Sequence, residues 1–447
     1  MKKIVTKLAS IVLAGTMLAG CGGGQTPSTE APKETKDTAV ATEAPAAPAS
    51  GDAKTMELWT FQEIHTGFYE KMAGIWNEKN PDRQIKLNFT VLPYDDMHSK
   101  LLIALQSGTG APDIADIELG KFANYLKGDP QLLPLNDVIE PELDNIVKSR
   151  VQIYGKDDKY YGICFHIGAS VTYYNKEILD KAGVNPATII TWDDFRAAGK
   201  IVLEKTGVPM ATTETSDPWS FWPMLASQGG DLLKPDGTPN IDSPEFIKAM
   251  TFIQAMIKEG TIVVAPGGFH HAEEYYGFMN GGGAASVSMP LWYMGRFTDY
   301  MADLNQKMLI APNPVWEKGQ PRSVGLGGTG TAVTNQAKDP QLAKDFLAFA
   351  KLSKEGGIEI WKTLGFDPIR TEVWNDPAIK EPNKFTDYFL NSPFDVLAEI
   401  KDEIPAIVTS ENLPKVMDAL KTTTLFRAFE DLEDPATLVA DEQSKLK

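Results

Sequence analysis

The sequence predicts an α/β protein with a parallel, doubly wound sheet, folded as two globular lobes. Strand-like apolar runs alternate with amphipathic helical stretches from residue 56 onward, which is typical of parallel sheets covered by helices. The chain has 447 residues, 43% of them hydrophobic, so it can bury a large core, and it is longer than one ordinary domain. Segments containing proline, 309–315 and 365–369, separate periodic stretches and are places where a chain can change lobes.

Residues 1–20 have the composition of a secretory signal peptide. A basic start with Lys2 and Lys3 precedes an apolar run, 8–18, that is too short to predict a membrane span. The end of this segment, LAGC, resembles the bacterial lipobox, in which the cysteine is lipidated and becomes the first mature residue. We expect a lipid anchor on Cys21, the alternative being an ordinary signal peptide followed by an incidental cysteine.

Residues 21–54 are predicted to form a disordered tether between the lipid anchor and the globular part. Residues 22–54 contain no aromatic residue, and Val40 is their only large aliphatic one. The second cysteine, Cys164, lies in an apolar context and is expected to be a small buried hydrophobe. Two cysteines cannot form a disulfide framework.

The formal charge of −17 limits the partners of this protein. An acidic surface is repelled by nucleic acid and by anionic lipid headgroups, so we expect no nucleic-acid binding. A neutral ligand fits this charge better than an anionic one.

The first elements alternate regularly between strand and helix. Strands are expected at 56–61, 85–91 and 111–118. Between them, Phe68, Met72, Ile75 and Trp76 line one face of a helix that Pro81 stops. A second helix has its apolar residues between 97 and 105 and ends at Gly108.

Residues 160–192 are expected to contain the first crossing between the lobes. A strand at 163–165 is followed by a break at Gly168 and by a second strand around Tyr173. A helix at 176–182 then closes at Gly183. We expect Tyr173 and Tyr174 to be packed in the core.

Several motifs, taken in order, resemble those of one protein family. They are WTF (59–61), SGTGAPDIADIE (107–118), YGICFHIGASVTYYNKEILDKAGV (161–184), TWDDF (191–195), DPWSFWPMLASQGG (217–230), YYGFMNGGGAA (275–285), SMPLWY (288–293) and GTAVTNQAKDPQLAKDFLAF (330–349). This series is similar to bacterial extracellular solute-binding proteins of the sugar-binding ABC-importer type, the group that includes maltose-binding protein.

The resemblance implies a periplasmic-binding-protein-like clamp of two lobes, each a doubly wound sheet flanked by helices, joined by three hinge crossings. By matching positions, the first lobe comprises residues 55–163 and 316–365. The second lobe comprises residues 164–315 and 366–447.

Sugar binding requires aromatic rings against the C–H face of a sugar and polar groups around its hydroxyls. The resemblance implies that Asp217, Trp219 and Trp292 supply these groups. Asp217 precedes a helix expected to begin near Trp219, so its alternative role is a helix cap. Trp222 is expected to pack beneath the site, and Trp59, Trp76, Trp192 and Trp361 are expected in the core.

Other candidates follow from position. The carboxyl ends of parallel strands bind ligands, which indicates Gln62, Glu63, His65 and Glu118. His166 lies at the first crossing, and Arg370, near the last, is a hydroxyl-binding or hinge-locking candidate. Gly328 belongs to GLGGTGT, which lacks the pattern of a phosphate loop and instead allows close backbone approach to a ligand or close packing.

The segment 267–278, GGFHHAEEYYGF, allows three interpretations. His270, His271, Glu273 and Glu274 suggest a metal site, but adjacent histidines are poorly placed to chelate one ion and no HExxH spacing is present. The same side chains could bind sugar hydroxyls, which makes His270, His271 and Glu273 ligand candidates. Alternatively, they form a solvated helix start. We predict no metal site and no cofactor.

The function that the resemblance implies is capture of a mono- or oligosaccharide, hinge closure, and delivery to ABC permease subunits. The protein would act at the extracellular face of a bacterial membrane as a lipid-anchored monomer. Segments 269–278 and 293–300 resemble the branch of this group that binds arabinose or arabino-oligosaccharides, which implies that class of ligand. Alternatives are a metal, polyamine or peptide cargo, or a carbohydrate-active enzyme using two of its many carboxylates. The sequence has no GxSxG, metal triad or phosphate loop, so we expect no enzyme activity.

Overall fold

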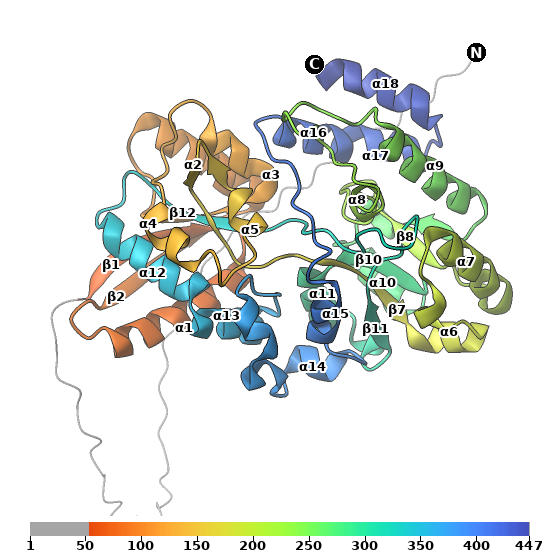
Figure 1. Cartoon of the computed structure of the whole chain (residues 1–447), viewed down its shortest axis with the longest axis horizontal. Coiled ribbons are helices and arrows are strands. Elements are labelled where there is room, and N and C mark those ends of the chain that lie inside the picture. Colours follow the sequence, from red (N-terminus) through yellow and green to blue (C-terminus); the bar gives the residue numbers. More distant parts are fainter. Residues whose placement is uncertain (1–52, 447) are drawn as a thin grey trace, which may run out of the picture. The chain divides into compact units, whose positions relative to one another are not determined.

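The computed structural model describes residues 53–446, which contain two five-stranded sheets (Figure 1). The first sheet has the order β2-β1-β3-β12-β6 and the second β11-β7-β10-β8-β9. We call the elements packed around each sheet the first lobe and the second lobe. The predicted signal peptide, the lipidation site Cys21 and nearly all of the predicted tether lie outside the described residues.

The strands of the first sheet are β1 (Lys54–Thr60), β2 (Ile85–Val91), β3 (Ile114–Glu118), β6 (Ile163–Cys164) and β12 (Thr329–Val333). Those of the second are β7 (Ser170–Asn175), β8 (Ala211–Thr213), β9 (Ile262–Val264), β10 (Ser286–Pro290) and β11 (Met308–Ala311). A small hairpin pairs β4 (Gly155–Lys156) with β5 (Lys159–Tyr160). β1 begins at Lys54, within the stretch predicted to be tether.

The three strands from which the sequence predicts a parallel sheet, β1, β2 and β3, are parallel, but both large sheets also contain antiparallel strands and are mixed. β1 runs parallel to β2 and β3, but β12 is antiparallel to β3 and β6. In the second sheet β8 runs parallel to β9 and β10, but β7 is antiparallel to β10 and β11. The chain passes from the first sheet to the second at β7 and returns to the first sheet at β12. Each of these two strands is antiparallel to both of its neighbours.

Helices cover the first sheet in the manner that the sequence predicts. They are α1 (Glu63–Lys79), α2 (Tyr94–Ser107), α3 (Leu119–Phe122), α4 (Asn136–Ile139), α5 (Ser149–Gln152), α12 (Pro340–Leu352) and α13 (Lys354–Glu359), which continues into a π-helical turn, Ile360–Leu364. Phe68, Met72 and Trp76 of α1 are buried on one face. α2 ends where Gly108 takes a left-handed conformation.

The second lobe contains α6 (Lys176–Ala182), α7 (Trp192–Thr206), α8 (Trp222–Ala226), α9 (Pro244–Lys258), α10 (Glu273–Asn280), α11 (Met294–Tyr300), α14 (Lys384–Tyr388) and α15 (Pro393–Ile400). The bounds of α6 are those predicted, because Asn175 caps its start and Gly183 takes the left-handed conformation at its end. Thr191 and Asp194 form a capping box on α7. Tyr173, Tyr174, Trp192 and Trp222 are buried, as expected.

Short 3-10 turns connect many of these elements. They are η1 (Ala123–Leu126), η2 (Glu140–Glu142), η3 (Pro186–Thr188), η4 (Pro266–Gly268), η5 (Leu291–Tyr293), η6 (Ala302–Leu304), η8 (Thr371–Asn375) and η9 (Pro377–Lys380). The turn η5 carries Trp292, and η8 follows Arg370.

The segment 164–170, which leads from β6 to β7, lies between two others. On one side the amide of Leu326 donates to the carbonyl of Gly168 over 2.9 Å, and on the other the amide of Ile167 donates to the carbonyl of Asp367 over 2.9 Å. The carboxylate of Asp367 also accepts from the amide of Ala169 over 2.9 Å. Segments 164–170, 323–328 and 366–369 therefore lie side by side where the chain passes between the sheets.

The predicted lobe boundaries, 55–163 with 316–365 and 164–315 with 366–447, remain a prediction, and contacts near them suggest two shifts. The rings of Trp316 and Phe252 lie 5.1 Å apart, which keeps residue 316 with the second lobe. Asp376, after the predicted last boundary, pairs with Lys354 of α13 at 2.6 Å. We propose that the chain returns to the first lobe near residue 323 and leaves it finally after η9.

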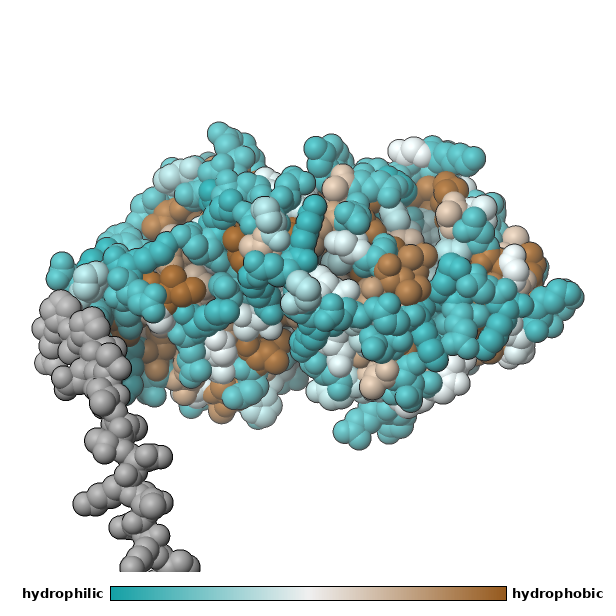
Figure 2. All heavy atoms as spheres, turned by 90° about the horizontal axis from the view of Figure 1, so that it is seen from below, coloured by the Kyte–Doolittle hydropathy of each residue, from teal (hydrophilic) through white to brown (hydrophobic). Residues whose placement is uncertain are grey.

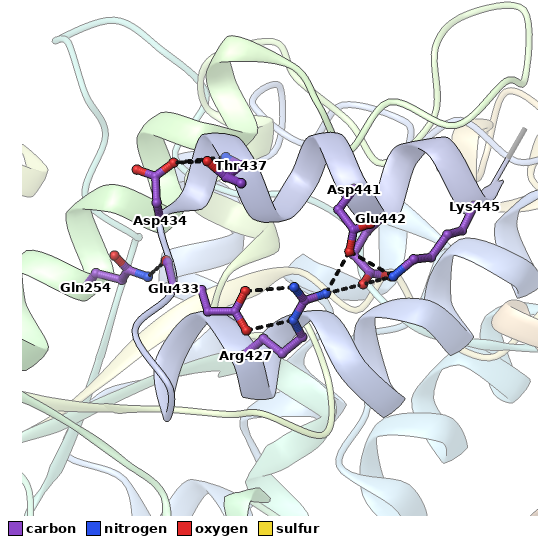
Figure 3. A network of polar contacts seen from close by, with 8 residues as sticks. All are labelled: Gln254, Arg427, Glu433, Asp434, Thr437, Asp441, Glu442 and Lys445. Atoms are coloured by element: carbon purple, nitrogen blue, oxygen red, sulfur yellow. Dashed lines mark hydrogen bonds and ion pairs between the residues drawn. The ribbon is translucent and has the colours of Figure 1, made fainter.

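The C-terminal helices pack on the second lobe and reach the first. They are α16 (Leu413–Ala419), a π-helical turn η10 (Leu420–Thr424), α17 (Leu425–Phe429) and α18 (Pro435–Leu446). Arg427 of α17 pairs with Glu442 of α18 at 2.6 Å and with Glu433, in the segment between the two helices, at 2.7 Å. Gln254 of α9 donates to the carbonyl of Glu433 (Figure 3). α16 contacts α3 of the first lobe.

The face seen in Figure 2 is largely hydrophilic, with apolar side chains in small separate patches. Large exposed hydrophobic side chains, such as Ile103 and Phe426, are scattered along residues 53–446. Within that range no helix is long and apolar enough to span a membrane.

Candidate binding site between the two lobes

Two carboxylates and one lysine from distant parts of the chain form the centre of the candidate site. Glu118 ends β3 of the first lobe, and Asp217 lies in the loop between β8 and α8 of the second. The Lys421 ammonium, on the turn η10, is 2.8 Å from Oδ1 of Asp217 and also attracts the charge of Glu118. The cluster therefore draws polar groups from both lobes.

Glu118 is held in place from its own lobe. Its Oε2 accepts a hydrogen bond from the Tyr94 hydroxyl over 2.8 Å and another from the amide of Gly120 over 2.7 Å. Burial raises the pKa of Glu118, while Lys421 and these two donors oppose the rise. Both hydrogen bonds go to one oxygen, Oε2, and they fix the orientation of the carboxylate.

Asp217 titrates close to neutral pH. Burial, helped by the nearby charges of Glu214 and Glu118, raises its pKa to about 7 against the attraction of Lys421. Burial lowers the pKa of Lys421, but Asp217 and Glu118 outweigh burial, and the net shift is upward. Lys421 is therefore a hydrogen-bond donor at neutral pH, and Asp217 can donate or accept.

Aromatic rings lie next to this polar cluster. The half-buried Trp292 stacks on His271 with ring centres 5.6 Å apart and meets the edge of Trp219 at 5.9 Å. Trp219 in turn stacks on the buried Trp222 at 6.3 Å, and Trp222 donates to Asp231. Trp219 is 8% exposed and Trp292 more so. Trp292 is therefore the ring with an accessible surface for stacking.

The indole of Trp292 also contacts the hinge segments. Its Nε1 donates to the carbonyl of Leu326 over 3.1 Å, and the amide of Leu326 donates to Gly168. The guanidinium of the buried Arg150 donates to the carbonyls of Gly325 and Gly327 on either side of Leu326, over 3.0 and 2.6 Å. The ring that faces the site is thus attached to the segment that joins the lobes.

The helix-cap role considered for Asp217 is wrong. α8 begins at Trp222, not near Trp219, and its N-cap is Phe221, without a side-chain cap. The residues between Asp217 and α8 form a turn in which the amide of Trp222 donates to the carbonyl of Pro218. Asp217 is therefore free of a capping role and pairs with Lys421.

The two adjacent histidines have different surroundings. His271 lies in the aromatic cluster, where burial and then Arg296 lower its pKa to about 3, so it is a neutral ring. His270 is fully buried, with Nε2 2.8 Å from the Thr212 hydroxyl and Nδ1 3.3 Å from Glu214. We propose a site that contains His271 and omits His270. Glu273 is exposed at the first turn of α10.

His65 belongs to a polar network inside the first lobe. It is 2% exposed, and its Nδ1 is 2.8 Å from the carboxylate of Asp116. Asp116 also accepts from Tyr69 and Thr331, and Lys351 donates to Thr331. This network ties the Nδ1 of the buried His65 to the interior of the first lobe. Gln62, half-buried at the N-cap of α1, and Glu63, exposed at its first turn, remain candidates.

Three further candidates are engaged within the protein. His166 packs against Phe366 with ring centres 4.8 Å apart, and burial lowers its pKa well below the usual value. Arg370 pairs with Glu142 at 2.7 Å and Glu372 at 2.8 Å. Gly328 has φ of 123°, and a side chain there would lie 2.7 Å from the Arg150 guanidinium, so this glycine allows close packing. We propose structural roles for all three.

Sequence reasoning missed Lys421, Tyr94, Arg150 and Arg296. Lys421 lies on a π-helical turn, KTTT, that has no recognisable motif, and its partner Asp217 is distant in sequence. Tyr94 follows β2, so the strand-end rule applied to that strand would have found it.

Comparison with known proteins gives one family. Residues 59–356 match the family described as "Bacterial extracellular solute-binding protein". The chain is 48% identical over 385 residues to an arabinooligosaccharide-binding protein of Bacillus subtilis (strain 168), covering 85% of this chain and 89% of the relative. It is 48% identical over 371 residues to a protein of the same name from Halalkalibacterium halodurans, covering 83% of each.

Solved structures confirm the fold class. The GacH receptor of Streptomyces glaucescens superposes with a TM-score of 0.70 at 20% identity, over 89% of this chain and 99% of that one. Maltose-bound MalE3 of T. maritima gives 0.69 at 19% identity, over 88% and 99%. Both are two-lobed solute-binding proteins. Proteins of this family act outside the cytoplasm, and the two relatives are named as binding proteins. The chain belongs to the bacterial extracellular solute-binding protein family.

Proposed function

We propose that this protein captures an arabino-oligosaccharide outside the cell and delivers it to the permease of an ABC importer. The observation that carries this proposal is the accessible ring of Trp292 beside a carboxylate and lysine cluster drawn from both lobes. The two relatives that are 48% identical are named for arabino-oligosaccharide binding, which supports this choice of sugar.

The chemistry of the cluster suits a neutral sugar. The face of Trp292 offers a surface for the C–H groups of a sugar ring. Lys421 donates, Glu118 accepts, and Asp217 can do either near pH 7, so vicinal hydroxyls would find both kinds of partner. Carboxylates outnumber the one lysine within the cluster, which gives an anionic ligand no advantage.

Binding of the ligand between the lobes also suggests how the permease could recognise the ligand-bound protein. A sugar that contacts Glu118 on the first lobe and Asp217 on the second stabilises an arrangement in which both are close. The permease subunits would recognise that arrangement. In this proposal the protein is a monomer, is anchored by a lipid on Cys21, and does not change its ligand chemically.

A direct test is a ligand screen with the purified mature protein. Arabino-oligosaccharides should raise the melting temperature and change the Trp fluorescence, while maltose, lactose, a polyamine and chelator-buffered metal ions should have smaller effects. Absence of any shift with sugars would overturn the proposal. A shift with a polyamine or metal alone would redirect it to that cargo, and release of shorter sugars would identify an enzyme.

A further inference from the structure

A hollow lies apart from the aromatic rings of the candidate site. It is a cavity of about 340 Å³ between the first lobe and residues 404–412, an irregular segment between α15 and α16 that we call the strap. The first-lobe walls come from α3, η1 and the hairpin strand β4. This volume lies within the range of about 300–1,000 Å³ that is typical of small-molecule sites.

The cavity adjoins the Glu118 side of the candidate site. Leu119, which lines it, directly follows Glu118, and Ile153, on another wall, directly precedes Tyr154. The ring of Tyr154 lies 4.7 Å, centre to centre, from that of Phe122 in α3, the helix that directly follows Glu118, so these walls are near that carboxylate. The strap leads into α16, which contacts α3, and then to the turn that carries Lys421.

The lining favours an uncharged ligand with hydroxyl groups. Leu119, Leu126 and Ile153 form apolar walls, while the strap contributes the hydroxyls of Thr409 and Ser410. The lining also includes Lys127 and Glu411, of opposite charge, and Lys156. The Lys156 ammonium already donates to the carbonyls of Leu126 and Gly128 over 2.8 and 2.7 Å, which leaves it less able to hold an anion.

The strap is attached to both lobes at this point. The Thr409 hydroxyl donates to the carbonyl of Ile153 over 3.2 Å in the first lobe. The Ser410 hydroxyl donates to the carbonyl of Gly237 over 2.7 Å in the second. A ligand under the strap would therefore contact a segment whose position depends on both lobes, as a ligand at the cluster does.

We propose that this cavity binds additional sugar units of the same oligosaccharide, and so makes the protein selective for longer chains. This inference rests on the proposed function. The cluster around Trp292 holds one part of the chain, and the sugar extends past Glu118 into the cavity. Affinity should then rise with chain length until the cavity is filled.

Calorimetric titration of the mature protein with a length series of arabino-oligosaccharides, from the disaccharide upward, tests the inference. Ala123→Trp fills the cavity from η1, and Glu411→Trp narrows it from the exposed strap, where folding is least affected. Ala187→Trp, an equal substitution at an exposed site on η3, is the matched control.

The wild type and the Ala187→Trp control should bind longer chains at least tenfold more tightly than the disaccharide. Both cavity variants should lose that gain while keeping the disaccharide affinity, which also shows that they are folded. The inference is overturned if the variants keep the full gain, or if wild-type affinity does not depend on length. Failure of the wild type to bind any sugar would instead remove the proposed function itself.

Discussion

At the scale of single residues, the candidate site depends on one partly buried ion pair beside one accessible ring. Asp217 and Lys421 are 2.8 Å apart, and burial would be costly for either charge without the other. Trp292 contributes both a ring face and a donor to the hinge. Variants of these residues therefore separate charge, stacking and hydrogen bonding.

Asp217→Asn should change how stability depends on pH in the ligand-free protein. The folded-state pKa of Asp217, about 7, is above the unfolded value, so the folded state holds the proton more tightly. The contribution of Asp217 to the free energy of unfolding is fully present below its unfolded pKa. It is lost as the pH rises through about 7, by an amount on the order of a few kcal/mol. Urea unfolding between pH 4 and 8 should show a flatter profile for the variant. An unchanged profile would contradict the raised pKa.

Trp292→Ala should weaken sugar binding by roughly 2 kcal/mol, about thirtyfold, because a central aromatic anchor is lost. Trp292→Phe keeps a ring but removes the donor to Leu326, and should lose less affinity. Isothermal titration with the same sugar measures both. Equal losses in the two variants would mean that the hydrogen bond matters and the ring face does not.

At the scale of elements, the adjacent segments 164–170, 323–328 and 366–369 are tightly packed. Gly168 has φ of 66°, and a Cβ there would lie 2.2 Å from the carbonyl oxygen of Leu326. Neither atom can move without displacing backbone. The site and the hinge thus share Leu326, which accepts from Trp292 and donates to Gly168.

Gly168→Ala should destabilise the protein by more than about 2 kcal/mol, because backbone strain and a steric clash add. Gly183→Ala, with φ of 74° but no atom within 4 Å of the new Cβ, is the matched control and should cost about 1 kcal/mol. Denaturant unfolding compares the two. Similar costs would show that the segments yield more easily than their packing suggests.

At the scale of the whole molecule, the candidate site is built by two lobes that each contribute a carboxylate. The C-terminal helices connect them, since Lys421 follows α16, which contacts α3, and Arg427 holds α17 to α18 (Figure 3). A ligand that bridges Glu118 and Asp217 should therefore alter the distance between lobes.

Ligand addition should reduce the radius of gyration of the mature protein in small-angle X-ray scattering. A sugar concentration that saturates the wild type but lies below the dissociation constant of the Trp292→Ala variant should leave the radius of that variant unchanged. If the wild type binds without any change in radius, the lobes do not move on binding, and recognition by a permease would need another signal.

The sequence predicted the elements that local chemistry defines. α6 occurs at 176–182 because Asn175 and Gly183 provide a start and a stop, and β2 occurs at 85–91 because its side chains alternate. The motif series indicated the family that the comparisons confirm. The core positions of Trp76, Trp222 and Trp361 followed from apolar stripes and a neighbouring proline.

The tertiary structure alone decided what those elements bring together. Lys421 meets Asp217, and Arg370 meets Glu142, across long stretches of chain that no local pattern relates. His65 and His270 looked available in sequence but found partners inside the lobes. β12 enters its sheet antiparallel because the chain returns from the other lobe. Caps and periodicity act between neighbours in sequence, whereas burial and charge pairing act between neighbours in space.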